Sequence, residues 1–336
     1  MIRLHFSMDD MGRIRFGFSP VHEAVLSVRT LANGSANALH APWLREVRPR
    51  LVGLDMELLG ALVRPAGYLP DFLLPAAAPG RSAGFDAGLT QVAASEPALV
   101  AAELAHLAQH PLAQRGPGRA ERVELLRALA ADPVPSLARI VAELRRYWRV
   151  AVAPYWPRIR ALLQADLTHR LEQLAAGGVQ QLFRTLHPLV AFRDGTLEIT
   201  KYYRGDADLR RRGLLLVPCV FAWPDVVVRT ADPLPAITYS PRGLGRLWEA
   251  PATGAATPLA DLLGRTRAAV LAQLDLPMST TQLACLLDLS APTLNVHLKT
   301  LQAAGILAAR RDGRAVLYRR TDLGERLLGG GADRAG

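Results

Sequence analysis

The chain has 336 residues, of which 50% are apolar and 21% charged, and its formal net charge is +10. This length predicts two or more folded domains, and the apolar content excludes a largely disordered protein. Cys219 and Cys285 are the only cysteines, which excludes a disulfide scaffold and a zinc site built from four thiolates. Only Lys201 and Lys299 are lysines, so nearly all of the positive charge is arginine.

Segments that enter or cross a membrane are not expected. The first ten residues, MIRLHFSMDD, carry acids where a signal peptide needs an apolar run. The longest apolar stretch, about 214–223, contains Pro218 and is too short to span a bilayer. We therefore expect a soluble, cytoplasmic protein. The positive charge favours an anionic partner, although charge alone argues for attraction and solubility rather than for a function.

The first 90 residues mix strand and helix signals. Residues 2–18 alternate loosely and predict one or two short strands. Ser19 followed by Pro20 is typical of a helix start, and apolar residues at helical spacing follow. Further helices are expected at about 43–51 and 54–63. Residues 64–90 are rich in proline, glycine and alanine, and they predict a loop with at most short turns.

The middle of the chain is predicted to be helical and then to change to strands. Apolar residues at three- and four-residue spacing predict helices near 96–110, 120–131, 136–152 and 156–186. Asp194-Gly195 between two short apolar runs predicts a hairpin. Further strands are expected at 214–220, 226–229 and 236–239. Residues 1–250 therefore predict an α+β domain, rich in helix and with a small antiparallel sheet.

Residues 250–258 (APATGAATP) form a small-residue linker, and a second domain is predicted at 258–328. Ser279 and Gln282 have the spacing of a capping box at a helix start. A tight turn at Asp288-Leu289 follows, and Ser290 can cap the next helix. Two short helices joined by so brief a turn predict a helix-turn-helix, whose second helix fits the major groove of DNA.

The second helix, about 291–303, has two distinct faces. One stripe is predicted to pack inward and consists of Leu294, His297, Leu298 and Leu301. The outer face carries Pro292, Val296, Lys299 and Thr300, with Thr293 and Asn295 on the flanks. Small, hydroxyl-, amide- and amine-bearing side chains suit base edges and phosphates. His297 is open to two interpretations, packing or phosphate contact. Gly305 is expected to end the helix.

A basic hairpin is predicted directly after this helix. Asp312-Gly313 separates two strand-like runs, 306–311 and 314–320, and is a strong hairpin signal. Arginines crowd its tip: Arg310, Arg311 and Arg314. Such a hairpin is placed to grip the neighbouring DNA backbone or minor groove. Arg319 and Arg320 are adjacent on a strand, so only one of them can share the face of Arg311.

These residues resemble the ArsR-like winged helix-turn-helix of bacterial transcriptional regulators over about 258–328. The resemblance rests on Ser290, Leu294, His297-Leu298, Leu301, Ala304-Gly305-Ile306, Arg310-Arg311, Gly313-Arg314 and Tyr318. It implies binding to duplex DNA as a homodimer at imperfect inverted repeats. The preceding part resembles the uncharacterised domain found before such modules in some high-GC bacteria. That match rests on Phe16-Gly17-Phe18-Ser19-Pro20, Leu186-His187-Pro188 and Gly213-Leu214-Leu215-Leu216-Val217-Pro218.

The chain departs from the metal-sensing members of this family. Their thiolate pair on the helix before the turn is missing, because only Cys285 is present there. Zinc or arsenite needs three or four soft or imidazole ligands. We therefore expect neither a bound metal nor another cofactor.

Charge supports a DNA-binding regulator as the leading hypothesis. Residues 290–320 carry six basic side chains and one acidic one, whereas 258–289 carry two basic and three acidic ones. The residues expected to contact DNA are Ser290, Pro292, Thr293, Asn295, Val296, His297, Lys299, Thr300, Arg310, Arg311 and Arg314. The N-terminal domain would supply dimer contacts or bind a small-molecule effector. The alternative is an enzyme or ligand-binding protein whose winged helix only tethers it to DNA or to a protein.

No catalytic constellation supports that alternative, and we expect no enzyme. Glu103, His106 and His110 fall on one helical face, as metal ligands could, but a surface or packing role is favoured because no further ligand is evident. The aromatic residues Trp148, Tyr155 and Trp156 are interpreted as core or interface residues, with a ligand pocket as the less favoured interpretation.

Overall fold

The structure is a computed structural model that describes residues 1–33, 38–77, 84–230, 234–248, 258–274, 277–287, 289–312 and 315–329. The chain forms two compact units. The first consists of residues 1–156 and 177–240, and the second consists of 157–176 together with the described part of 241–336. Within the described ranges, no helix is long and apolar enough to cross a membrane.

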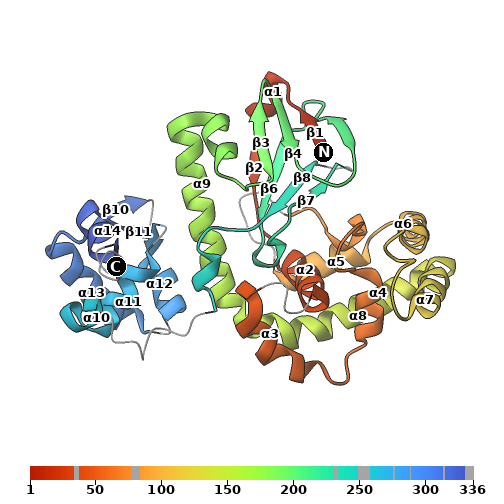
Figure 1. The fold of residues 1–336 in the computed structure, drawn as a ribbon, viewed down its shortest axis with the longest axis horizontal. Helices are drawn as coiled ribbons and strands as arrows, with labels where there is room; N and C mark the ends of the chain where they lie inside the picture. Colours follow the sequence, from red (N-terminus) through yellow and green to blue (C-terminus); the bar gives the residue numbers. More distant parts are fainter. Residues whose placement is uncertain are drawn as a thin grey trace, which may run out of the picture. The chain divides into compact units, whose positions relative to one another are not determined.

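The first unit combines a helical layer with two sheets (Figure 1). Its helices are α1 (Met8–Met11), α2 (Pro20–Asn33), α3 (Ala41–Val47), α4 (Met56–Leu62), α5 (Phe85–Ala93), α6 (Pro97–Gln109), α7 (Arg119–Ala131) and α8 (Pro133–Ala151). The predictions of a helix from Pro20 and of helices near 96–110, 120–131 and 136–152 are confirmed. The segment predicted as a helix at 43–51 is α3 followed by a turn of 3₁₀ helix at Arg48–Leu51.

Helix α5 corrects the prediction that residues 64–90 form a loop. The helix begins at Phe85, whose ring stacks on Trp148 with 4.3 Å between centroids. Gly88 faces Val21 so closely that an added Cβ would lie 2.7 Å from Val21 Cγ2. Glycine here serves close packing of two helices, and the high glycine content of the segment concealed the helix. Trp148 also contacts Trp156 edge to face at 5.6 Å. Trp148 is buried in the core, in agreement with the prediction of a core or interface role, whereas Tyr155 and Trp156 are half-buried.

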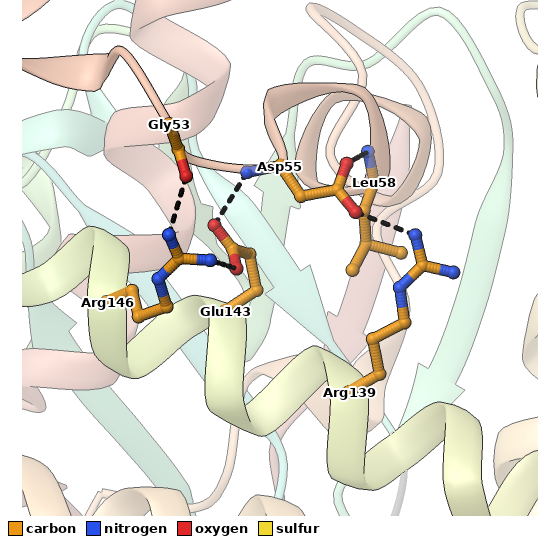
Figure 2. A network of polar contacts seen from close by, with 6 residues as sticks. All are labelled: Gly53, Asp55, Leu58, Arg139, Glu143 and Arg146. Carbon is orange, nitrogen blue, oxygen red and sulfur yellow. Dashed lines mark hydrogen bonds and ion pairs between the residues drawn. The ribbon is translucent and has the colours of Figure 1, made fainter.

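A polar network fixes the start of α4 against α8 (Figure 2). Asp55 caps α4 by accepting from Leu58 N at 2.9 Å, and its other oxygen pairs with Arg139 Nη2 at 2.7 Å. Glu143 accepts from Asp55 N at 2.7 Å and pairs with Arg146 at 2.9 Å. Hydrogen bonding to Leu58 N and then the Arg139 guanidinium lower the pKa of Asp55. One face of α8 therefore holds the loop before α4 through charged hydrogen bonds.

The strands of the first unit form two four-stranded sheets. One has the order β3-β4-β1-β5, made of β3 (Val190–Arg193), β4 (Thr196–Ile199), β1 (Ile2–His5) and β5 (Gly205–Asp208). The other has the order β2-β6-β8-β7, made of β2 (Ile14–Phe16), β6 (Leu214–Pro218), β8 (Ala236–Tyr239) and β7 (Val227–Arg229). The predicted hairpin around Asp194-Gly195 is confirmed as β3 and β4.

The α+β class is confirmed, but the expectation of a single small antiparallel sheet is wrong in its detail. Both sheets are mixed, because β1 runs parallel to β5, and β6 runs parallel to both β2 and β8. All five residues of β6 are buried, which is typical of a strand inside a parallel arrangement. The strands near the N-terminus pair with strands about two hundred residues later, and local periodicity carries no information about such partners.

Helix α9 (Trp156–Arg184) contains a break that the sequence analysis did not predict. Gly177 and Gly178 leave the helical conformation, and Gly178 has φ 63° and ψ −161°, a region that only glycine adopts readily. The helical segment before the break, 157–176, belongs to the second unit, and the segment after it belongs to the first. Two consecutive glycines, without Cβ atoms, allow this change of direction.

The second unit contains a helix-turn-helix and a β-hairpin together with that segment of α9. Its elements are α10 (Pro258–Leu263), α11 (Arg265–Gln273), β9 (Met278–Ser279), α12 (Thr280–Leu287), α13 (Ala291–Ala303), β10 (Leu307–Asp312), β11 (Ala315–Arg320) and α14 (Asp322–Gly329). The three strands form an antiparallel sheet in the order β10-β11-β9. The core of this unit contains the fully buried residues Val270, Leu271, Leu283, Leu294 and Leu298.

We predict that Gly178→Ala lowers the free energy of unfolding by about 1–3 kcal/mol, because alanine would be strained in this backbone conformation. Gly60→Ala is the matched control, since Gly60 lies inside α4 with ordinary backbone angles. An added Cβ has open space at both positions. The control should be neutral or stabilising by about 0.5–1 kcal/mol. Chemical denaturation compares the two, and equal effects would contradict the strained conformation at Gly178.

Candidate nucleic-acid interface

The first helix of the helix-turn-helix, α12, begins with the predicted capping box. Ser279 N donates to Gln282 Oε1 at 2.7 Å, and Gln282 N donates to Ser279 Oγ at 3.3 Å. This reciprocal pair satisfies two amides that a helix start otherwise leaves without partners. Gln282 Nε2 also donates to Ala161 O of α9 at 3.4 Å. The capping residue therefore links α12 to the part of α9 that belongs to the same unit.

The predicted inner stripe of α13 is confirmed. Leu294, Leu298 and Leu301 are at most 1% exposed, and they seat the helix on its neighbours. His297, at the edge of this stripe, is half-buried, and its Nδ1 atom is buried without a hydrogen-bond partner in the described structure. The packing interpretation of His297 therefore accounts for its position.

The opposite face of α13 is open to solvent. The exposed residues there include Pro292, Thr293, Val296, Lys299 and Thr300, and Asn295 is half-buried on a flank. Val296 is 62% exposed, which is unusual for a valine with only an internal packing role. This surface offers an amine, an amide and a small apolar side chain to a partner.

Three hydroxyl groups among the candidate residues already bind atoms of α13 itself. Ser290 caps the helix by accepting from Thr293 N at 3.3 Å, and its Oγ lies 2.7 Å from Thr293 Oγ1. Thr300 Oγ1 donates to Val296 O one turn earlier at 2.9 Å. The hydroxyls therefore shape the helix, while Lys299 is exposed on its outer face and Asn295 is half-buried on a flank.

Helix α13 ends where the sequence predicted. Gly305 has φ 69°, its N–H donates to Gln302 O at 2.9 Å, and Ile306 N donates to Leu301 O at 3.0 Å. This is the hydrogen-bond pattern of a Schellman motif, which glycine favours because of the positive φ. It turns the chain directly into β10.

The hairpin of β10 and β11 sorts its arginines onto two faces. Arg311 pairs across the hairpin with Val316 and shares its face with Arg320, whereas Arg310 shares the other face with Arg319. Arg320 lies on the same face of the hairpin as Arg311, but its side chain is only 8% exposed. It pairs with Glu325 Oε1 at 2.9 Å and donates to Leu271 O at 3.1 Å, so it supports the fold.

Arg310 has a partner that the sequence analysis missed. Its Nη2 donates to Glu172 Oε1 at 2.7 Å, from β10 to the segment of α9 in the same unit.

Gln302 was also missed as a surface residue of α13. It is exposed, three residues after Lys299 and seven after Asn295, a spacing that places the three on neighbouring positions of one helix side. Gly313 and Arg314 lie outside the described residues.

A buried charge network fixes the α9 segment within the second unit. Asp166 and Arg170 are at most 1% exposed and pair with 3.5 Å between Oδ1 and Nε. Arg170 donates to Gln173 at 3.0 Å, and Asp166 accepts from Arg242 N at 3.0 Å. Arg242 also lies 2.9 Å from Nε2 of His169. Burial and then the charges of Arg242 and Arg170 lower the pKa of His169 to about 4, so this imidazole is neutral.

The chemistry-bearing residues of the first unit make structural contacts. Glu103 accepts from Phe72 N at 3.0 Å, while His106 packs against Tyr68 at 4.6 Å between ring centroids. In the part of the chain that the structure describes, no three His, Cys, Asp or Glu residues are grouped to hold a metal ion. The side chain of Cys285 is outside that description.

Glu23 of α2 is the most deeply buried carboxyl of this set. It accepts hydrogen bonds from Val220 N at 2.8 Å, from Phe221 N at 3.3 Å and from Cys219 Sγ at 3.2 Å. Burial raises the pKa of Glu23 to about 7, although the two amides and the thiol favour its ionised form. Burial and the neighbouring Glu23 carboxyl raise the pKa of the Cys219 thiol, so this cysteine is an unreactive donor.

Comparison with known families identifies two regions of the chain. Residues 82–241 match a family described as a family of unknown function (DUF5937), and residues 262–310 match a family described as a helix-turn-helix domain. No curated protein and no solved structure matches the chain. The prediction of a helix-turn-helix preceded by an uncharacterised domain is therefore confirmed at this level, and the domain indicates a DNA-binding regulator of transcription.

We predict that Glu23 makes stability depend on pH. The pKa of Glu23 is higher in the folded than in the unfolded protein. Its contribution to the free energy of unfolding is therefore complete at low pH and is lost as pH rises from about 4.5 through 7. Relative to Glu23→Gln, the wild type should lose about 2.5 kcal/mol of unfolding free energy between pH 5 and pH 8. Denaturant unfolding of both proteins across this range tests it. Parallel pH profiles would show that Glu23 does not titrate there.

Proposed function

We propose that this protein is an ArsR-like transcriptional regulator that inserts α13 into the major groove of duplex DNA. The carrying observation is the division of α13 into a buried leucine stripe and an exposed polar face, within a region that matches a helix-turn-helix domain. A helix seated in this way offers its outer face to a groove about 12 Å wide.

The chemistry of the outer face suits both base edges and phosphates. Lys299 supplies a cation for a phosphate or a guanine edge, and Asn295 supplies an amide that can pair with adenine. Val296 suits the methyl group of thymine. Gln302 extends this amide-bearing side of α13, and we add it to the candidate contacts. Pro292 and Thr293 at the helix start lie where a recognition helix meets base edges.

The hairpin would grip the flanking backbone or minor groove. Because Arg310 and Arg311 point to opposite faces of β10, one hairpin can offer a cation to each side of a groove. Arg314, outside the described residues, remains part of the proposed contact set on its place in the sequence. Ser290 and His297 would contribute mainly by shaping and seating α13.

We further propose a homodimer that binds a near-palindromic operator. Two-fold symmetry would place two α13 helices about one turn of DNA apart, roughly 34 Å. The residues before the helix-turn-helix would supply the dimer contacts and bind a small-molecule effector. A hollow of about 520 Å³ in the first unit is the place that we propose for this effector, and its lining carries both charges, with Arg3 and Arg204 beside Asp206.

The proposal assigns no catalytic step and no cofactor to the chain. In the interior, Glu23 accepts hydrogen bonds from Val220 N and from the thiol of Cys219. Glu103 accepts one from Phe72 N. A regulator of transcription works in the compartment that holds the DNA, and by the resemblance to bacterial regulators we propose that this compartment is the cytoplasm.

Fluorescence anisotropy with duplex DNA from upstream of the protein's own gene tests the proposal. Titrations at two salt concentrations, with a random duplex as competitor, separate specific from general binding. Tight, salt-dependent binding that survives the competitor supports the proposal, because released counterions make phosphate contacts salt-sensitive. Binding equal to that of the random duplex, for this DNA and for a genome-derived library, would contradict it.

We predict that Lys299→Ala weakens binding to specific and random duplexes alike and flattens the log–log salt slope by about one unit. Arg127→Ala is the matched control, because Arg127 is an exposed cation on α7 in the first unit. The control should leave both affinity and slope unchanged. If the two variants behave identically, α13 does not contact DNA through Lys299.

We predict that Ser290→Asp and Ser290→Ala separate helix capping from DNA binding. Aspartate caps a helix as well as serine does, whereas alanine should lower the unfolding free energy by about 0.5–2 kcal/mol. The aspartate variant should nevertheless bind DNA more weakly than the wild type, because it adds a negative charge beside phosphates. Thermal unfolding and anisotropy measured together test this, and full DNA affinity in Ser290→Asp would place the start of α13 away from the backbone.

A further inference from the structure

The hairpin arginine that points toward α9 is already paired with a carboxylate. Arg310 Nη2 and Glu172 Oε1 are 2.7 Å apart, and the two residues are 138 positions apart in the chain. The Arg310 side chain is 61% exposed and that of Glu172 is 33% exposed. The contact therefore lies on the surface, where a third charged group can reach the guanidinium.

Glu172 is held in place by a rigid support. Arg170, two residues before it, belongs to the buried network with Asp166 and Gln173, and Asp166 accepts from Arg242 N. About three turns before Glu172 on α9, Ala161 O accepts a hydrogen bond from Gln282 of α12. The helix that carries Glu172 is thus joined at two other points to the unit that carries Arg310.

We propose that Glu172 is a built-in competitor that occupies Arg310 and lowers the affinity of the hairpin for DNA phosphates. This inference rests on the proposed function. A carboxylate and a phosphate oxygen are both anionic acceptors for a guanidinium. A phosphate that approaches Arg310 must displace Glu172 or remain beside its negative charge, and either case weakens binding.

The course of the chain connects this contact to the first unit. The segment 157–176 is joined to the first unit at both of its ends, after Trp156 and before Gly177. Glu172 lies five residues before Gly177, where the helix breaks. The contact therefore lies close in sequence to the point where the chain passes from the second unit back into the first.

Solvent exposure sets the size of the effect. Exposed ion pairs contribute little because water and salt screen them. Removing Glu172 should therefore raise DNA affinity by about two- to five-fold at ~0.1 M salt, and less at higher salt. A modest barrier of this kind suits a contact that DNA itself must be able to displace.

The test measures DNA affinity of the full-length protein by anisotropy, on the duplex used above. Glu172→Gln removes the charge but keeps the shape. Glu198→Gln is the matched control, because Glu198 also pairs with an arginine, Arg3, at 3.1 Å and has a similarly exposed side chain, 27%. Both variants raise the net charge by one, so general attraction to DNA affects them equally. We expect tighter binding only for Glu172→Gln.

A double-mutant cycle assigns the effect to the pair. In an Arg310→Ala background, Glu172→Gln should no longer change the affinity. Equal gains for Glu172→Gln and Glu198→Gln, or an undiminished gain without Arg310, would overturn the proposal, as would no gain at all. If neither the wild type nor any variant binds DNA, the proposed function itself fails, an outcome distinct from a DNA-binding protein in which Glu172 has no effect.

Discussion

The buried ion pair between Asp166 and Arg170 is the interaction on which the arrangement of the second unit depends. Two charges that lose their water are stable only when their partners and hydrogen bonds replace it. Here the carboxylate also receives the backbone N–H of Arg242, and the guanidinium also binds Gln173. The pair thus joins the middle of α9 to the chain that leads into the helix-turn-helix, and the larger part of a long helix, residues 157–176, belongs to that unit.

Because of this attachment, the helix-turn-helix packs against α9. Its helices and hairpin are not surrounded by solvent alone, because α9 contacts α12 through Gln282 and the hairpin through Arg310. The same helix continues, after the break at Gly177 and Gly178, into the first unit. The first unit and the surface that we propose for DNA are therefore connected along the chain through α9.

On α13, which carries the surface that we propose for DNA, different side chains have different roles. Leucines at 294, 298 and 301 hold α13 in place, so the orientation of every other side chain follows from the helical period. Serine and threonine hydroxyls satisfy the backbone at the start and middle of the helix. Lys299, Asn295 and Gln302 are the polar side chains of α13 that we propose as contacts with DNA. This set is smaller than the one expected from the sequence, because the hydroxyls bind the helix itself.

The sequence by itself determined the elements whose signals are local. The capping box at Ser279, the cap at Ser290, the leucine stripe of α13, the end at Gly305 and the hairpin at Asp194-Gly195 all follow from residues a few positions apart. Only the tertiary structure decided the parallel pairing of β1 with β5 and of β2 with β6, the helix in the glycine-rich segment at Phe85, the break in α9 and the partner of Arg310. These features depend on residues far apart in the chain or on packing against them, which helical and strand periods do not encode.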